Sequence, residues 1–172
     1  MVVFDAGVIP DRVKERLNVK ARKDLELLRD RLSLLDVPYV MSVVMFGSRA
    51  RGESGERSDV DLLVLLENCE VEDPVARRRL LYMLIRKALG GEFEGLTVVD
   101  VELERFLKPE EVSPLLLNVY WDGVVVYDKT GSLCDFLQEA RERIVKSGLK
   151  RVKDREAYFW MLPKPMKEVK IL

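Results

Sequence analysis

The sequence contains no histidine, and this absence narrows the kinds of chemistry open to the chain. Imidazole titrates near neutral pH and serves many enzymes as a metal ligand, a general base or a nucleophile. In this protein, other side chains must therefore fill any of these three roles.

Cysteine and long apolar segments are also scarce. Cys69 and Cys134 are the two cysteines, they lie far apart in no C-x-x-C pair, and we expect reduced thiols. No stretch approaches the ~20 apolar residues of a membrane-spanning helix. The first residues, MVVFDAGVIPDRVKERL, meet acid and base too early for a secretory signal. We therefore expect a cytoplasmic protein without a membrane partner.

Charge of neither sign dominates. The formal net charge is −1 and the pI about 5.8, so no global basic field exists to hold long nucleic acid. Hydrophobic residues make up 48% and charged residues 34%, which is typical of a globular protein. A length of 172 residues suits one domain.

Apolar periodicity and turn residues predict an alternation of helices and strands. The expected helices cover residues 20–36, 74–89, 109–118 and 131–147, and the expected strands cover 39–46, 59–66, 96–103 and 123–128. Residues 1–10 are expected to form an extended lead-in, and residues 156–172 a docked tail. This order predicts an α/β or α+β sheet with packed helices. The single domain, 1–172, would have a core at about 20–130, followed by a C-terminal helix and tail at 131–172.

Two aspartates open one of the predicted strands. Asp59 and Asp61 are spaced i and i+2, so their side chains project from the same face of the strand. Adjacent carboxylates repel each other, and a divalent cation compensates for that repulsion. All-oxygen ligation favours Mg²⁺ or Mn²⁺. Taken alone, the pair could also mark a solvated strand end.

A glycine-serine turn precedes this pair. The strand over 39–46 runs into Gly47-Ser48, followed by Arg49 and Arg51, and backbone N–H groups in such a turn can bind phosphate. The Ser48 hydroxyl can donate to a phosphate oxygen, and the two arginines can neutralise a triphosphate. A P-loop is rejected, because Glu53 occupies its lysine position.

A third carboxylate is expected from a neighbouring strand. Asp100 lies between valines in the predicted strand 96–103, where a charge needs a partner, and a metal is a suitable one. Glu102 shares its face and is the second choice, while a solvated edge is the alternative for both.

These motifs together resemble the DNA polymerase beta-like nucleotidyltransferase superfamily, and most of all the minimal nucleotidyltransferases of archaea and bacteria. The residues that carry the resemblance are Gly47-Ser48-Arg49-Ala50-Arg51-Gly52, then Ser58-Asp59-Val60-Asp61-Leu62, then Asp100. The downstream segment PEEVSPLLLNVYWDGVVVYDK and the aromatic, proline-containing tail are also similar to small archaeal members. The resemblance therefore covers most of the chain.

The resemblance implies a mixed sheet flanked by helices and a metal-dependent transfer of a nucleoside monophosphate. Gly47 and Ser48 would bind the phosphates of a triphosphate, with ATP the expected donor. Asp59 and Asp61 would hold the metal, and Asp100 would activate the acceptor hydroxyl. Many minimal members resemble antitoxins that partner small helical HEPN proteins. The alternative function is therefore a binding partner of such a protein, with weak or no catalysis.

Overall fold

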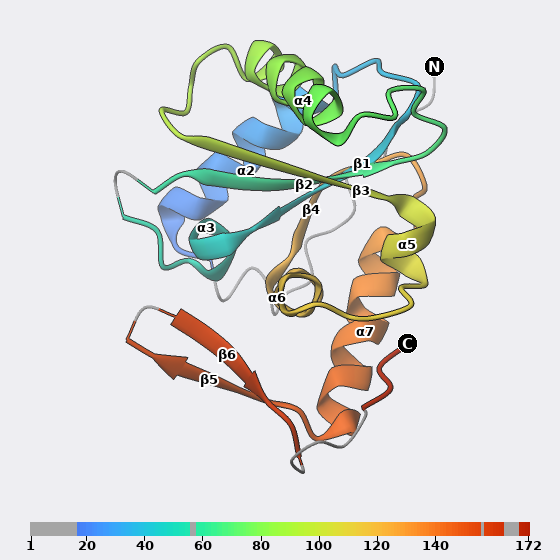
Figure 1. Cartoon of the computed structure of the whole chain (residues 1–172). Coiled ribbons are helices and arrows are strands. Elements are labelled where there is room, and N and C mark those ends of the chain that lie inside the picture. The colour runs from blue at the N-terminus through green and yellow to red at the C-terminus, as the bar shows by residue number, and fades with distance from the viewer. Residues whose placement is uncertain (1–16, 56–57, 156, 164–168) are drawn as a thin grey trace.

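The structure is a computed structural model that describes residues 17–55, 58–155, 157–163 and 169–172 (Figure 1). The lead-in predicted over residues 1–10 lies outside the described residues. The helices are α2 (Val19–Leu32), α3 (Gly47–Arg51), α4 (Pro74–Leu89), α5 (Leu103–Leu107), α6 (Pro114–Asp122) and α7 (Leu133–Ser147). The strands are β1 (Val40–Phe46), β2 (Val60–Leu66), β3 (Leu96–Glu102), β4 (Val124–Asp128), β5 (Lys150–Asp154) and β6 (Ala157–Met161).

A four-stranded mixed sheet forms the centre of the fold, in the order β3-β2-β1-β4. Strand β1 pairs antiparallel with both β2 and β4, whereas β2 and β3 run parallel. The connection from β2 to β3 passes through α4, the helical crossover that parallel neighbours require. The predicted fold class, a mixed sheet flanked by helices, is confirmed.

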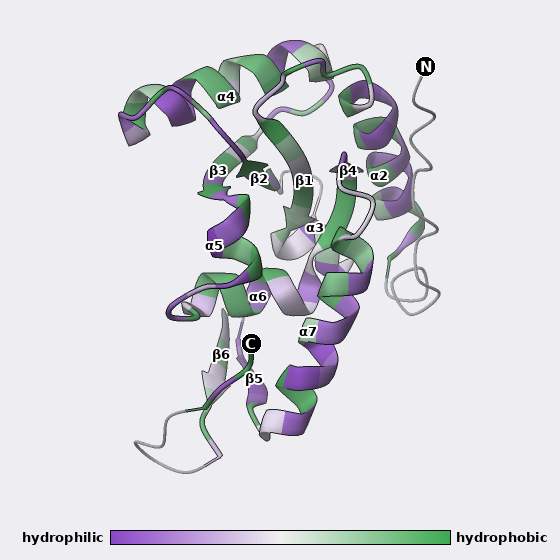
Figure 2. Cartoon of the chain, turned by 90° about the vertical axis from the view of Figure 1, so that its right-hand side faces the viewer, coloured by the Kyte–Doolittle hydropathy of each residue, from purple (hydrophilic) through white to green (hydrophobic). Residues whose placement is uncertain are grey.

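Helices cover both faces of this sheet (Figure 1). Helices α2 and α4 bury Leu25, Leu28, Leu81 and Ile85 against one face. On the opposite face, α5, α6 and α7 contribute a second cluster that includes Phe106, Tyr120 and Leu137. Figure 2 shows the central strands as mainly apolar ribbons between helices of mixed character. Because both faces of the sheet are buried, the sequences of β1 and β2 are almost continuously apolar instead of alternating with polar residues.

Local capping fixes the helix ends that the sequence indicated. Helix α4 begins with Asp73 accepting a hydrogen bond from the Ala76 N–H, has Pro74 in its first turn, and ends at Gly90, as predicted. Pro114, expected to break a helix over 109–118, instead begins α6, where a missing N–H costs nothing. Helix α2 ends at Leu32, earlier than the predicted 36, and α5 was not predicted.

The C-terminal segment differs most from expectation. Instead of a docked tail alone, residues 150–161 form a two-stranded antiparallel hairpin of β5 and β6. Its residues alternate, because Tyr158 and Trp160 are partly buried while Phe159 and Met161 are 45% and 50% exposed. Strand β5, with the sequence KRVKD, carries almost no apolar patterning, and for that reason the sequence did not indicate a hairpin.

No helix among residues 17–55, 58–155, 157–163 and 169–172 combines the length and the apolar character needed to cross a membrane.

Candidate active site

The predicted glycine-serine turn joins β1 to the short helix α3. Gly47 adopts φ +75°, a conformation that glycine tolerates and other residues rarely adopt. The Ser48 carbonyl accepts hydrogen bonds from the N–H groups of Gly52 and Glu53, and so it closes the turn. Gly52 then ends α3 with φ +73°. The backbone of residues 47–53 is therefore held in one compact arrangement.

The two aspartates lie beside this turn, at the start of β2. Phe46 pairs with Asp61 across β1 and β2, which brings Gly47 onto the Asp61 carboxylate. A Cβ on Gly47 would lie 2.0 Å from Asp61 Oδ2, and a Cβ on Gly95 would lie 1.7 Å from Asp59 Oδ1. Each carboxylate thus occupies the space that a side chain would take on the facing glycine. The glycine-serine turn and the D-x-D pair therefore lie side by side.

Electrostatics at Asp61 fit a site for a cation. Burial is the main reason that the pKa of Asp61 is raised, and the charge of nearby Asp59 raises it further. The hydrogen bond between Thr97 and the Asp61 carboxylate acts in the opposite direction and lowers this pKa. Arg51 and Arg49 lower it through their charges. A half-buried carboxylate beside a second one is costly to ionise, and a bound divalent cation would offset that cost. The donor set here is all oxygen, which suits Mg²⁺ or Mn²⁺.

Asp100 does not join this pair, and the prediction of three converging carboxylates is wrong. Thr97 is opposite Asp61 in the parallel β2–β3 ladder, and Asp100 is opposite Val64, three positions further along. An odd offset reverses the face, so Asp100 points away from the side that carries Asp61. Glu102 shares the face of Asp100, lies opposite Leu66, and does not replace it.

Asp100 has partners of its own on that opposite face. Its side chain is only 1% exposed, and Arg77 of α4 donates to Oδ2 at 2.7 Å while Arg78 lies 3.5 Å from Oδ1. The hydrogen bond that Arg77 donates to Asp100 is the main reason that the pKa of Arg77 is raised. The charge embedded among valines is therefore balanced by arginines, and it ties α4 to β3. Within the described residues, no group of three or more acidic or cysteine side chains is arranged to hold a metal.

Arg49 has a different place from the one predicted. Its side chain is buried, and the guanidinium donates to the Ser58 and Asp59 carbonyls and forms an ion pair with Asp24 of α2. The guanidinium also lies 5.6 Å from the centre of the Phe93 ring. These contacts occupy its fork of donors, so the prediction that Arg49 faces the phosphates is wrong. Arg49 instead fixes the backbone that leads into Asp59.

Arg51 keeps a position close to the predicted site. It lies near enough to Asp61 to lower the pKa of that carboxyl, and its side chain remains 18% exposed. Its Nε donates to Glu53 Oε2 at 2.9 Å, and its guanidinium lies 4.8 Å from the centre of the Tyr158 ring in β6. The C-terminal hairpin therefore contacts the residue that follows the turn.

Sequence reasoning missed three participants at the site. Thr97 of β3 pairs with Asp61, Gly95 directly before β3 lies against Asp59, and Asp24 anchors Arg49. Gly95, directly before a predicted strand, was the available signal for a close approach of two segments. Nothing in the sequence pairs Asp24 with Arg49, because that contact joins α2 to a segment 25 residues away.

The structure thus places a tight glycine-serine turn, at the end of one strand, beside a D-x-D pair at the start of the next. Residues 24–150 match the family described as the nucleotidyltransferase domain, and the chain belongs to that family. The protein is thus a nucleotidyltransferase, a minimal member of the polymerase beta-like superfamily, as the motifs indicated.

Individual proteins also resemble this chain. A Methanocaldococcus jannaschii protein with the provisional name protein adenylyltransferase is 28% identical over 118 residues, covering 66% of this chain and 73% of that protein. A solved structure provisionally described as a nucleotidyltransferase from Sulfolobus solfataricus covers 63% of this chain and 84% of that one, with 18% identity and a TM-score of 0.44. A solved toxin–antitoxin with AMP-PNP covers 74% of this chain and 97% of that one, with 24% identity and a TM-score of 0.37.

Proposed function

We propose that this nucleotidyltransferase transfers AMP from ATP to an acceptor hydroxyl and releases pyrophosphate. The observation that supports the proposal is the joint placement of Gly47 on Asp61 and of Gly95 on Asp59, which sets two carboxylates beside the phosphate-binding turn. The relative named as a protein adenylyltransferase favours the adenine nucleotide and a protein hydroxyl as acceptor.

Each residue of the site has a role in this proposal. The Gly47 turn and the Ser48 hydroxyl bind the triphosphate tail, and Arg51 adds a positive charge beside it. Asp59 and Asp61 would hold Mg²⁺ or Mn²⁺, which when bound would supply charge stabilisation to the transferred group. The Thr97 hydroxyl donates a hydrogen bond to Asp61 and so orients that carboxylate.

The reaction exchanges a phosphoanhydride bond of the donor for a phosphoester bond to the acceptor. The acceptor oxygen attacks the α-phosphorus in line, a new O–P bond forms, and the bond from the α-phosphorus to the bridging oxygen breaks. Pyrophosphate leaves with that oxygen, and the acceptor proton passes to solvent. The two aspartates and the turn fix the donor so that attack is in line, which makes positioning their main contribution.

The test is transfer of label from α-labelled ATP, with Mg²⁺ or Mn²⁺ present, to protein, RNA-end and small-molecule acceptors. We expect labelled product and pyrophosphate from the wild type and loss of both in Asp59→Asn and Asp61→Asn. Asp30→Asn, an exposed aspartate on α2, is the matched control and should keep full transfer. Calorimetry should show weaker metal binding, with nucleotide present, in the two site variants alone. Unchanged metal affinity in both would overturn the assignment.

A second candidate function is that of an antitoxin-like partner of a small helical HEPN-type protein, with weak or no catalysis. One observation favours it, because the described residues bring two acidic side chains to the turn instead of three, with Thr97 on β3 opposite Asp61. The same transfer assay separates the two functions. Binding of a helical partner that persists in Asp61→Asn, together with no transfer by the wild type, would favour the binding role.

A further inference from the structure

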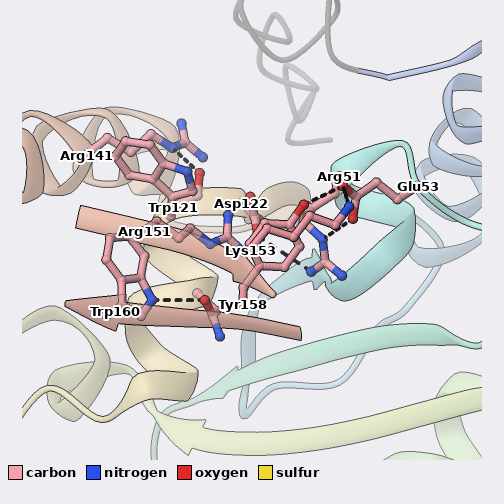
Figure 3. Close-up of polar contacts among 10 residues, drawn as sticks. Arg51, Glu53, Trp121, Asp122, Arg141, Arg151, Lys153, Tyr158 and Trp160 are labelled. Atoms are coloured by element: carbon pink, nitrogen blue, oxygen red, sulfur yellow. Dashed lines mark hydrogen bonds and ion pairs between the residues drawn. The ribbon is translucent and has the colours of Figure 1, made fainter. Parts of the chain in front are cut away.

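The β5–β6 hairpin meets the nucleotide site through a cluster of charged and aromatic side chains (Figure 3). The cluster comprises Arg51, Glu53, Asp122, Arg151, Lys153 and Tyr158. The family match ends at residue 150, the first residue of β5, so the hairpin follows the shared domain. The cluster therefore joins a segment outside the family match to the residues directly after the phosphate-binding turn.

Glu53 contacts both the hairpin and Arg51, and its two carboxylate oxygens have different partners. Lys153 donates to Oε1 at 2.8 Å, and the Tyr158 hydroxyl donates to the same oxygen. Arg51 donates to Oε2 at 2.9 Å. If Arg51 moved to a phosphate, the two hairpin donors on Oε1 would stay in place. The carboxylate would then keep two charge-compensating partners.

Asp122 likewise has a cation of the hairpin as its nearer partner and Arg51 as a more distant one. Arg151 of β5 binds it with two hydrogen bonds of 2.9 and 2.6 Å, whereas Arg51 lies 3.7 Å from its Oδ2. The six side chains thus include three cations and two carboxylates, and the two hairpin cations match the two acids. The cluster therefore carries one cation more than it has acids. Arg51, which pairs with Glu53 at 2.9 Å and lies 3.7 Å from Asp122, is the cation that could turn to a triphosphate while both acids keep a hairpin partner.

The hairpin itself is firmly attached to the domain. Trp160 of β6 donates to the Asn118 side chain of α6 at 3.0 Å and packs edge-on against Trp121, with ring centres 5.7 Å apart. Arg151 of β5 binds Asp122 of α6, and within the hairpin its guanidinium carbon lies 4.0 Å from the centre of the Tyr158 ring. These contacts do not involve Arg51, so the hairpin can hold Glu53 whether or not Arg51 is engaged elsewhere.

We propose that the β5–β6 hairpin is a positioning element of the nucleotide site, in which Lys153 and Tyr158 hold the Glu53 carboxylate so that Arg51 can bind the triphosphate of the donor. Without those two donors, Glu53 would compete for Arg51 and would place an uncompensated negative charge two residues from it. That charge would repel the triphosphate. This inference rests on the proposed function, because it assumes a nucleoside triphosphate at the turn.

The experiment measures the affinity for MgATP by calorimetry in a set of conservative variants. Lys153→Met combined with Tyr158→Phe keeps the aliphatic stem and the stacked ring but removes both donors. We expect its dissociation constant for MgATP to rise about tenfold, the effect of weakening one charged hydrogen bond. Phe159→Ala, on the exposed side of the same strand, is the matched control and should bind as the wild type does.

The decisive variant adds Glu53→Gln to the double variant. If the hairpin acts by neutralising Glu53, removal of the Glu53 charge restores the affinity to about the wild-type value, and Glu53→Gln alone binds MgATP as tightly as the wild type or more so. A merely structural hairpin predicts the opposite, because the third change removes further contacts and cannot restore binding. Retained tryptophan fluorescence confirms that the hairpin stays docked in each variant.

The outcomes separate the two proposals. Binding of MgATP by the wild type without any AMP transfer would overturn the proposed function and leave the hairpin inference standing if the rescue occurs. Transfer with no rescue by Glu53→Gln, or with no loss in the double variant, would overturn the hairpin inference alone. Failure of the wild type to bind MgATP would overturn both.

Discussion

Gly47 lies directly on the Asp61 carboxylate, so closely that a Cβ at position 47 would come within 2.0 Å of Oδ2. The positive φ of Gly47 turns the chain at the end of β1, and the antiparallel register brings that turn onto the second aspartate of the D-x-D pair. The glycine-serine turn and the acidic pair are therefore in direct contact, so a change in the shape of one must displace the other.

Gly47→Ala should abolish nucleotide transfer and destabilise the fold. A left-handed conformation costs an L-residue roughly 1–2 kcal/mol, and the added methyl group must also push Asp61 aside. Gly131→Ala is the matched control, because Gly131 has φ +69° and a Cβ added there would meet nothing within 4 Å. We expect both variants to lose the stability that the left-handed conformation costs, and Gly47→Ala to lose more because of the clash with Asp61, as measured by urea unfolding. Loss of transfer is expected from Gly47→Ala alone. Equal transfer by the two variants would show that Gly47 does not position Asp61.

Asp100→Asn should lower stability and leave transfer per folded molecule unchanged. The substitution removes a charge that Arg77 and Arg78 balance on the far face of the sheet. Because both arginines are partly exposed, we expect a loss near the lower end of the roughly 3–5 kcal/mol that breaking a buried pair costs. The melting temperature and the rate of AMP transfer, measured on the same preparation, distinguish this role from catalysis. A fall in the rate of transfer at unchanged stability would instead show that Asp100 takes part in the reaction.

Arg49→Lys should weaken both the fold and the metal-nucleotide complex. Lysine keeps a positive charge beside Asp24 but cannot reproduce the fork that reaches the Ser58 and Asp59 carbonyls. We expect unfolding to become easier by roughly 1.5–3 kcal/mol, the range for hydrogen bonds with a charged partner. Arg79→Lys, at an exposed position of α4, is the control. Reduced MgATP affinity without any loss of stability would instead indicate that Arg49 touches the phosphates directly.

The contact between Glu53 and the hairpin should be sensitive to acid. Burial alone would raise the pKa of Glu53, but hydrogen bonds from Lys153, Tyr158 and Arg51 outweigh burial and lower this pKa from 4.5 to about 2. A lowered pKa in the folded state means that the contact stabilises fully above the unfolded value of 4.5 and is lost as the pH falls toward 2.

The free-energy difference between the wild type and Glu53→Gln isolates this contribution from that of other carboxylates. We expect the wild type to be more stable above about pH 5 and the difference to shrink steadily below about pH 4.5. Trp121 and Trp160 are the only tryptophans and flank the hairpin contact, so their fluorescence can follow unfolding in urea. A difference that stays constant down to about pH 2.5 would show that Glu53 is not held by these donors.

Several features of the site follow from local sequence alone. Asp59, directly before β2, and Asp61, in β2, stay close enough for their charges to interact, because a single residue separates them along the chain. The turn at Gly47-Ser48 and the boundaries of α4 follow from residues a few positions apart, through backbone freedom and capping. Such relations depend on neighbours along the chain, and they were predicted correctly.

Contacts between distant segments were decided by the tertiary structure. The sequence placed Asp100 on a strand, but the register of β3 against β2 determines whether it lies on the face that carries Asp61. Arg49 was expected at the phosphates because it directly follows the glycine-serine turn, whereas its partner Asp24 is distant in sequence. Lys153 and Tyr158 reach Glu53 across 100 and 105 residues, a distance over which no local pattern constrains the chain. The sequence thus determined the chemistry available at the site, and long-range packing decided which side chains meet there.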